Sequence, residues 1–187
     1  HELRTPLNAI TGWTSLLRRG GLDASTRERA IEVIGRNAEA QRRLIDELLD
    51  MSRIISGHIR LDLQPLSLSE VLTRAVEAVR PIAEARRQHL VLHLDEAAPT
   101  LTGDAARLQQ VFANLLGNAV KFTPADGHIT VTVVPGADQL TVHVADDGVG
   151  IAPGFLPHVF DHFRQAHAAG RPAGGLGLGL SIVRQLV

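Results

Sequence analysis

The chain has 187 residues, of which 44% are hydrophobic and 21% charged, so it can form one domain and a smaller partner with a packed core. Its formal net charge of -1 gives no signature of nucleic-acid binding, and no basic run points to a membrane surface. The absence of cysteine excludes disulfides and thiolate metal sites and suits a cytoplasmic protein. No apolar run is long enough to span a membrane, so we expect any membrane anchor of the full-length protein upstream of this sequence.

The first third of the chain predicts a hairpin of two helices. An apolar stripe marks the first helix, residues 20–23 interrupt it, and Ser25 or Thr26 is the expected N-cap of the second. Because two such helices enclose little core, we expect them to dimerise into a four-helix bundle, the alternative being that both pack only on the second domain. The predicted seam of the second helix follows a heptad pattern and comprises Ile31, Ile34, Ala38, Gln41, Ile45, Leu48, Ser52 and Ile55.

Residues 61–65 are predicted to form a short extended hinge, and a second domain begins near residue 61. Helical periodicity and strand-like alternation follow each other from there to the end of the chain. This order predicts an α/β sandwich in which one antiparallel sheet is covered by helices on one side. The predicted helices cover residues 68–84, a long segment through 110–120 capped by Asp104, and 180–187, and the predicted strands cover residues 89–94, 129–134 and 140–145.

The long helix carries a polar edge beside an apolar stripe. Gln110, Asn114, Asn118 and Lys121 fall within one quarter of the helical wheel, and Lys121 is the only lysine of the chain. Asparagine oxygens suit a Mg²⁺ ion that already holds phosphate oxygens and waters, and a lysine supplies a compact charge for phosphate. The alternative is a surface lysine with two capping asparagines.

Two glycine-rich segments follow. Asp146 ends an apolar strand, where its carboxylate can accept a hydrogen bond from an adenine amino group, while Gly148 and Gly150 let the backbone approach the base. An ordinary Asp-Gly turn is the alternative. Residues 175–179 alternate glycine with leucine before the last helix, where exposed amides can bind phosphates, although a flexible lid or a helix C-cap would have the same composition.

His1 differs from the other histidines in its setting. A neutral imidazole is a competent nucleophile toward a phosphoryl group, and the adjacent Glu2 can orient the ring and take its proton. The remaining histidines lack such a neighbour and are expected at the surface or satisfied in the core.

Taken together and in this order, the motifs HELRTPLNAI, NLLGNAVKF, DDGVGI and GGLGLGL resemble the transmitter core of a sensor histidine kinase of a two-component system, a module that also occurs in hybrid kinases. The resemblance covers the whole chain. It implies a dimerisation and histidine phosphotransfer hairpin at residues 1–60, followed at residues 61–187 by a Bergerat-type (GHKL) ATP-binding α/β sandwich. The family's first helix extends before the H box and its ATP domain continues beyond Val187, so both domains are expected to be truncated here.

The resemblance also implies residue roles. In the H box, His1 is the phosphoacceptor, Glu2 the acid-base partner, and Thr5 helps to position water during dephosphorylation of the partner. Asn118 ligates Mg²⁺. Two positions depart from the family pattern, because His162 stands where proline is frequent and Leu176 where threonine is frequent. The implied ATP-binding residues are Asn114, Asn118, Lys121, Phe122, Asp146, Gly148, Gly150, Ile151, Phe163, Arg164, Gly175, Gly177, Leu178, Gly179 and Leu180.

The function implied is Mg-ATP-dependent autophosphorylation of His1, followed by phosphoryl transfer to an aspartate of a response-regulator receiver domain. ATP and Mg²⁺ are the implied cofactors, and a second copy of the chain and the receiver domain are the implied partners. Three alternatives are open: a nucleotide-binding dimerisation fragment without kinase activity, a phosphatase-dominant transmitter, and an ATPase of the gyrase, Hsp90 and MutL type. The HELRTP segment argues against the last of these.

Overall fold

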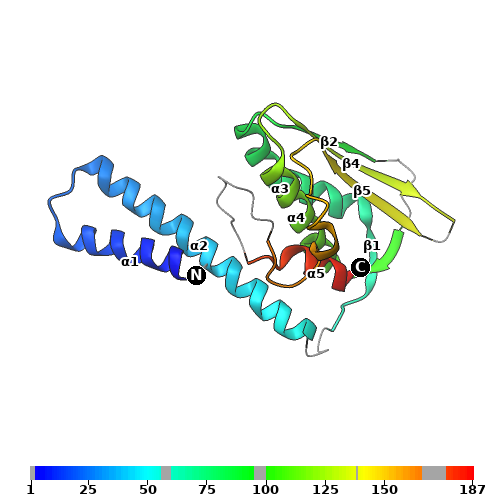
Figure 1. Cartoon of the computed structure of the whole chain (residues 1–187), viewed down its shortest axis with the longest axis horizontal. Helices are drawn as coiled ribbons and strands as arrows, with labels where there is room; N and C mark the ends of the chain where they lie inside the picture. The colour runs from blue at the N-terminus through cyan, green and yellow to red at the C-terminus, as the bar shows by residue number, and fades with distance from the viewer. Residues whose placement is uncertain (1–2, 56–59, 95–99, 138, 166–175) are drawn as a thin grey trace. The chain divides into compact units, whose positions relative to one another are not determined.

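The computed structural model describes residues 3–55, 60–94, 100–137, 139–165 and 176–187, without the side chains of residues 54 and 55 (Figure 1). The chain divides into two compact units. One unit comprises residues 1–58 and 163–178 and contains a helical hairpin. The other comprises residues 59–162 and 179–187 and contains two sheets and three α-helices. A hairpin followed by an α/β domain is the fold class that the sequence predicts.

The hairpin consists of α1 (Arg4–Arg19) and α2 (Ala24–Ile55), which pack side by side. The N-cap of α2 differs from the prediction. Asp23, rather than Ser25 or Thr26, accepts the hydrogen bonds, from the backbone N of Thr26 at 2.7 Å and from the Ser25 hydroxyl at 2.8 Å. An aspartate at this position can receive both donors at once, and these bonds lower the pKa of its carboxyl group.

The predicted seam of α2 is only partly the face that packs within the hairpin. Ala30 and Leu44 are buried, whereas Ile31 and Ile45, one position further along, are 61% and 45% exposed. A helix that packs on one neighbour buries one stripe and leaves the adjacent stripe of the heptad exposed. The sequence pattern therefore combines a face used inside the hairpin with a face that is open within this chain.

Two sheets form the α/β unit. Strand β4 (His128–Pro135) lies between β2 (His89–His93), to which it is parallel, and β5 (Leu140–Asp146), to which it is antiparallel. Separately, β1 (Gln64–Ser67) pairs in antiparallel fashion with β3 (Thr100–Gly103).

The prediction of one antiparallel sheet was therefore wrong in two respects. The chain returns from β2 to β4 through α4, and a crossover of this kind brings two strands parallel. The extended hinge expected at residues 61–65 runs into β1, where Pro65 is tolerated because a two-stranded sheet has only edge strands. Strand β3 was not predicted.

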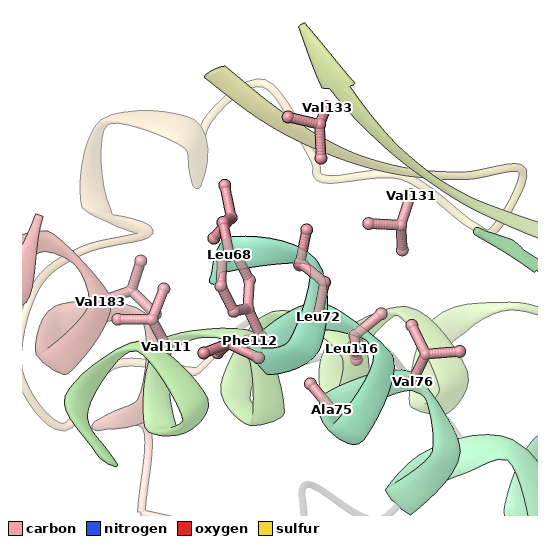
Figure 2. Packing of buried hydrophobic residues seen from close by; sticks show 11 residues of the cluster. Leu68, Leu72, Ala75, Val76, Val111, Phe112, Leu116, Val131, Val133 and Val183 are labelled. Atoms are coloured by element: carbon pink, nitrogen blue, oxygen red, sulfur yellow. The ribbon is translucent and has the colours of Figure 1, made fainter. Parts of the chain in front are cut away.

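The helices α3 (Leu68–Ala85), α4 (Ala105–Phe122) and α5 (Gly179–Leu186) confirm the predicted ones, with ends that differ by two residues at most, and a short 3₁₀ turn, η1, spans Leu156–His158. The core lies between the helices and β4 (Figure 2). Alternate residues of β4 point toward α3 and α4, because successive side chains of a strand face opposite sides. The core residues include Leu68, Leu72, Ala75, Val76, Val111, Phe112, Leu116, Val131, Val133 and Val183.

Within the part of the chain that the structure describes, no helix combines the length and the apolar character needed to cross a membrane.

Candidate functional site

The polar edge of α4 is positioned by a helix whose start is fixed as predicted. The Asp104 side chain accepts hydrogen bonds from the backbone N atoms of Ala106 at 3.0 Å and Arg107 at 3.1 Å. One face of α4 is buried in the core, whereas Asn114 and Asn118 are half-buried and Lys121 is exposed. The three polar side chains thus lie along the boundary between core and surface, where a ligand can reach them.

Asn114 stands out because its amide is not satisfied by the protein. Its Nδ2 atom is buried and has no hydrogen-bond partner. The first residue of α5 approaches closely, since a Cβ added at Gly179 would lie 3.3 Å from Asn114 Oδ1. Buried donors are nearly always paired in folded proteins, so an unpaired amide at the edge of a motif indicates a group that a ligand or water completes.

The carboxyl end of α4 is held by the turn before β2. The buried Gln88 side chain donates from Nε2 to the carbonyl oxygens of Val120 at 3.0 Å and Thr123 at 2.7 Å. Arg86 also donates from Nη1 to the Val120 carbonyl oxygen. These bonds satisfy carbonyls that a helix end leaves without intrahelical donors, and they fix the position of Lys121. The Lys121 ammonium lies 5.0 Å from the centre of the Phe122 ring.

The loop after β5 packs directly against this helix end. A Cβ added at Gly148 would lie 2.7 Å from the Phe122 carbonyl oxygen and 2.6 Å from Asp146 Oδ1, distances that real side chains do not adopt. The Val149 backbone N donates to the same Phe122 oxygen at 3.4 Å. Glycine is therefore required at residue 148 to bring the loop and the helix together.

Asp146 is at the open side of that loop. Its Oδ1 atom accepts a hydrogen bond from the Gly148 backbone N at 2.9 Å, which orients the side chain, and Asp146 is exposed to solvent, so its outward oxygen Oδ2 is accessible to a ligand. Gly150 has a positive φ of 67°, and a Cβ added there would meet nothing within 4 Å. Ile151 is 48% exposed next to it. This part of the predicted site is open and flanked by apolar surface.

Phe163 and Arg164, two of the implied ATP-binding residues, meet Gly177 within the unit that contains the hairpin. The Phe163 backbone N donates to the Gly177 carbonyl oxygen at 3.2 Å, and a Cβ added at Gly177 would lie 2.5 Å from the Arg164 carbonyl oxygen. Phe163 is 60% exposed, whereas Leu178 is fully buried. Leu180 is half-buried in α5, and Gly175 lies outside the described residues.

The predicted H box is described only from residue 3 onward, so His1 and Glu2 lie outside the described residues. Thr5 is exposed in the first turn of α1 and lines a groove of the hairpin together with Asn37, Arg43 and Glu47. Burial raises the pKa of Glu47, and the charge of Arg43 acts in the opposite direction.

Sequence reasoning missed Arg86 and Gln88, which hold the helix end from more than thirty residues away. The only signal was an amide side chain directly before a predicted strand, which is too common to carry a prediction.

The described residues show no cluster for a metal ion. Among them, no group of three or more His, Asp or Glu side chains is arranged to hold a cation. A Mg²⁺ ion at Asn118 would accordingly take most of its ligands from phosphate oxygens and water, which agrees with the preference of Mg²⁺ for few protein ligands.

Two family models match the chain. Residues 1–57 match the His Kinase A (phospho-acceptor) domain, and residues 103–187 match the histidine kinase-, DNA gyrase B- and HSP90-like ATPase domain. Together they cover more than half of the sequence, in the order that the motifs predict. The chain is a histidine kinase transmitter core.

Known proteins resemble this histidine kinase core over its whole length. The Sensory/regulatory protein RpfC of Xanthomonas campestris pv. campestris is 38% identical over 195 residues, which cover 100% of this chain and 27% of RpfC. The crystal structure of full-length ShkA in complex with AMPPNP matches with a TM-score of 0.76 and 31% identity, covering 100% of this chain and 38% of that one. Histidine kinase ThkA in complex with the response regulator protein TrrA shares the fold, with a TM-score of 0.72 and 21% identity over 100% of this chain and 52% of that one.

The kinase core thus spans about a quarter of the length of RpfC. It combines a phospho-acceptor domain of the histidine kinase type with an α/β domain of the ATPase type.

Proposed function

We propose that this chain binds Mg·ATP in its α/β unit, transfers the γ-phosphoryl group to His1, and passes it to an aspartate of a response-regulator receiver domain. The observation that carries the nucleotide part is the buried Nδ2 atom of Asn114, which has no protein partner and lies one turn from Asn118 on the same helix. A donor left unpaired at this place is suited to an oxygen of a bound ligand.

The nucleotide would be held by residues that fit its parts. The outward oxygen of Asp146 can accept from the adenine amino group, and Gly148 and Gly150 let the base approach the backbone. Lys121 supplies positive charge for phosphate, and Asn118 an oxygen for Mg²⁺. When bound, Mg²⁺ neutralises phosphate charge, which with positioning accounts for most of the acceleration in phosphoryl transfer. The ShkA structure with AMPPNP supports this assignment by its similarity over the whole chain.

Phosphoryl transfer needs His1, Glu2 and Thr5 in the roles that the H box implies. An imidazole nitrogen of His1 attacks the γ-phosphorus, the bond from that phosphorus to the oxygen of the ADP leaving group breaks, and Glu2 takes the proton from the other ring nitrogen. Thr5, which is exposed on the hairpin, would help Glu2 to position water in the reverse, dephosphorylating direction.

The receiver domain and a second copy of the chain are the partners of this proposal. The receiver domain is supported by the ThkA structure, because the kinase in it has the fold of this chain and is bound to a response regulator. For the second, large apolar side chains are exposed on both hairpin helices, among them Leu7 at 51%, Ile31 at 61% and Leu49 at 52%. Burying such a face in a four-helix bundle removes apolar area from water. Residues 1–60 would be this dimerisation part and 61–187 the catalytic part of a protein placed in the cytoplasm, where ATP and the receiver domain are available.

The proposal is tested by labelling with γ-labelled Mg·ATP. The chain, a His1→Gln variant and a matched His143→Gln variant, which changes an exposed histidine of β5, are scored for label that is acid-labile and alkali-stable. We expect label on the chain and on the His143 variant, and none on the His1 variant. ATP binding without label on any of them would favour the noncatalytic dimerisation fragment. In a second assay with a phosphorylated receiver domain, fast loss of the receiver's phosphate in the presence of the chain would favour a phosphatase-dominant transmitter.

A further inference from the structure

Two neighbouring carboxylates at the end of β5 have different surroundings. Asp146 is turned to its own loop and is the proposed adenine acceptor, whereas Asp147 is turned to His128, the first residue of β4. Asp147 Oδ1 accepts from the His128 backbone N at 2.8 Å, and Asp147 Oδ2 lies 3.1 Å from His128 Nδ1. In return, the Asp147 backbone N donates to the His128 carbonyl oxygen at 3.2 Å. One residue of β4 therefore fixes Asp147 through three contacts.

The carboxylate determines the state of the histidine ring. The hydrogen bonds from the His128 backbone and then from its ring lower the pKa of Asp147, so this side chain is an anion and can only accept. His128 Nδ1 must therefore carry the proton that is shared with Asp147.

The groups near the His128–Asp147 pair have interactions of their own. The His89 ring of β2 stacks on the His128 ring with 4.9 Å between the ring centres. Asp126, whose carboxylate interacts with His89, is held by Arg87 in a two-pronged ion pair with both N–O distances at 2.9 Å. Asp147 is consequently the carboxylate in contact with His128, and His89 is the ring stacked on it.

Close packing makes the pair dependent on its neighbours in the chain. A Cβ added at Gly127 would lie 2.7 Å from Asp147 Oδ1 and 2.6 Å from the Thr123 side chain. On the other side, Gly148 contacts the Phe122 backbone. The loop from residue 146 to 149 thus contacts both the end of α4 and the start of β4. Asp146 directly precedes Asp147, the residue that makes the contact to β4.

We propose that His128 is a positioning residue that, through Asp147, fixes the Asp146 carboxylate for the 6-amino group of adenine and so sets the preference of the site for adenine nucleotides. This inference rests on the nucleotide binding proposed above. The physical reason is that a carboxylate at the start of a glycine-containing loop keeps one direction only if the next residue is fixed.

The experiment measures dissociation constants by calorimetry for Mg·ATP and for purine riboside triphosphate, which lacks the 6-amino group. The chain is compared with His128→Leu, with His128→Asn, whose amide can donate near the position of Nδ1, and with His143→Leu, a matched exposed histidine on the same sheet. We expect His128→Leu to weaken ATP binding about fivefold, the scale of one hydrogen bond, and to leave the analogue nearly unchanged. His128→Asn should restore most of the preference for ATP over the analogue, because its amide can still donate to Asp147.

Several results would overturn the inference. If His128→Leu weakened both nucleotides equally, the residue would only stabilise the fold, and thermal unfolding of the variants without nucleotide would show the same order. If His128→Leu and His143→Leu had the same preference for ATP over the analogue, the His128 ring would have no role in it. If the unaltered chain bound neither nucleotide, the proposed function itself would fail, which is distinguishable from selective ATP binding that does not depend on His128.

Discussion

Replacing Gln88 with methionine tests whether the carboxyl end of α4 depends on the turn before β2. Gln88 is only 6% exposed, and its Nε2 atom donates to the carbonyl oxygens of Val120 and Thr123. Methionine keeps the length and the apolar stem of the side chain and removes both polar atoms. The change therefore isolates the hydrogen bonds from the packing.

The magnitude follows from which groups lose their partners. Val120 O keeps the Arg86 donor, whereas Thr123, 1% exposed, loses the donor to its carbonyl, which costs about 1 to 3 kcal/mol. The Gln88 Oε1 atom is itself buried without a partner, so its removal returns about 1 kcal/mol. With the middle of that range as the cost, the net loss is about 1 kcal/mol, and the unfolding midpoint of the 187-residue chain should fall by about 2 to 4 °C.

Thermal and urea unfolding, followed by circular dichroism, measure this loss. Gln139→Met is the matched control, because Gln139 is an exposed glutamine of the same unit. A Gln88→Met variant that unfolded together with the control would refute the reasoning. It would show that the helix-end carbonyls find other donors at no cost. Nucleotide affinity should fall as well, because the Gln88 bonds to Val120 and Thr123 hold the helix end on either side of Lys121 and Phe122.

Three further changes have definite expectations. Asp104→Ala should cost about 0.5 to 2 kcal/mol in urea unfolding, with Asp104→Asn nearly neutral. Burial raises the pKa of Asp104, but backbone hydrogen bonds outweigh it and lower the pKa below its ordinary value of 3.8. The stability that the cap contributes is therefore present above pH 3.8 and is lost as the pH falls through the lowered pKa. Gly148→Ala should weaken ATP binding about tenfold or more in calorimetry, since its Cβ would lie 2.7 Å from the Phe122 carbonyl oxygen. Glu47→Gln should stabilise the hairpin at pH 7 but not at pH 4, because burial raises the pKa of Glu47 more than Arg43 lowers it.

The parts of the site that lie within one element were predictable from spacing. Helical periodicity placed Asn114, Asn118 and Lys121 along one edge of a helix, and Asp104 has the residue type and position of an N-cap. Strand alternation likewise placed Asp146 at the end of β5. Each inference needs only local geometry, which a sequence specifies directly.

Contacts between distant residues were not predictable in the same way. Gln88 reaches Thr123 across 35 positions, and His128 reaches Asp147 across 19. The first contact comes from the residue directly before β2, which pairs parallel with β4 although the sequence predicts one antiparallel sheet. The second comes from the register of the antiparallel pair β4 and β5, in which Ile129 faces Asp146. Strand periodicity shows which face is buried but not the direction of the neighbouring strand, so the residues that depend on that direction could not be found.

The face of α2 that packs on α1 could not be predicted from the sequence either. The heptad pattern of α2 predicted that the helix packs against partners, but not which stripe faces α1. Leu44 is 9% exposed and Ile45 is 45% exposed, although both are large and aliphatic. Hydrophobicity alone does not distinguish a face that is buried within the hairpin from one that is open within this chain.

Both ends of α4 are held by side chains, and this arrangement links the nucleotide motif to distant parts of its unit. At the amino end, the Asp104 carboxylate that caps the helix through Oδ1 also accepts the Asp62 backbone N at 3.1 Å through Oδ2. At the carboxyl end, Gln88 connects the helix to the start of β2. A helix fixed at both ends cannot shift along its axis without breaking these bonds, so Asn114, Asn118 and Lys121 are held in place relative to the rest of the unit. For the nucleotide binding proposed above, such a site loses little free energy to ordering the protein.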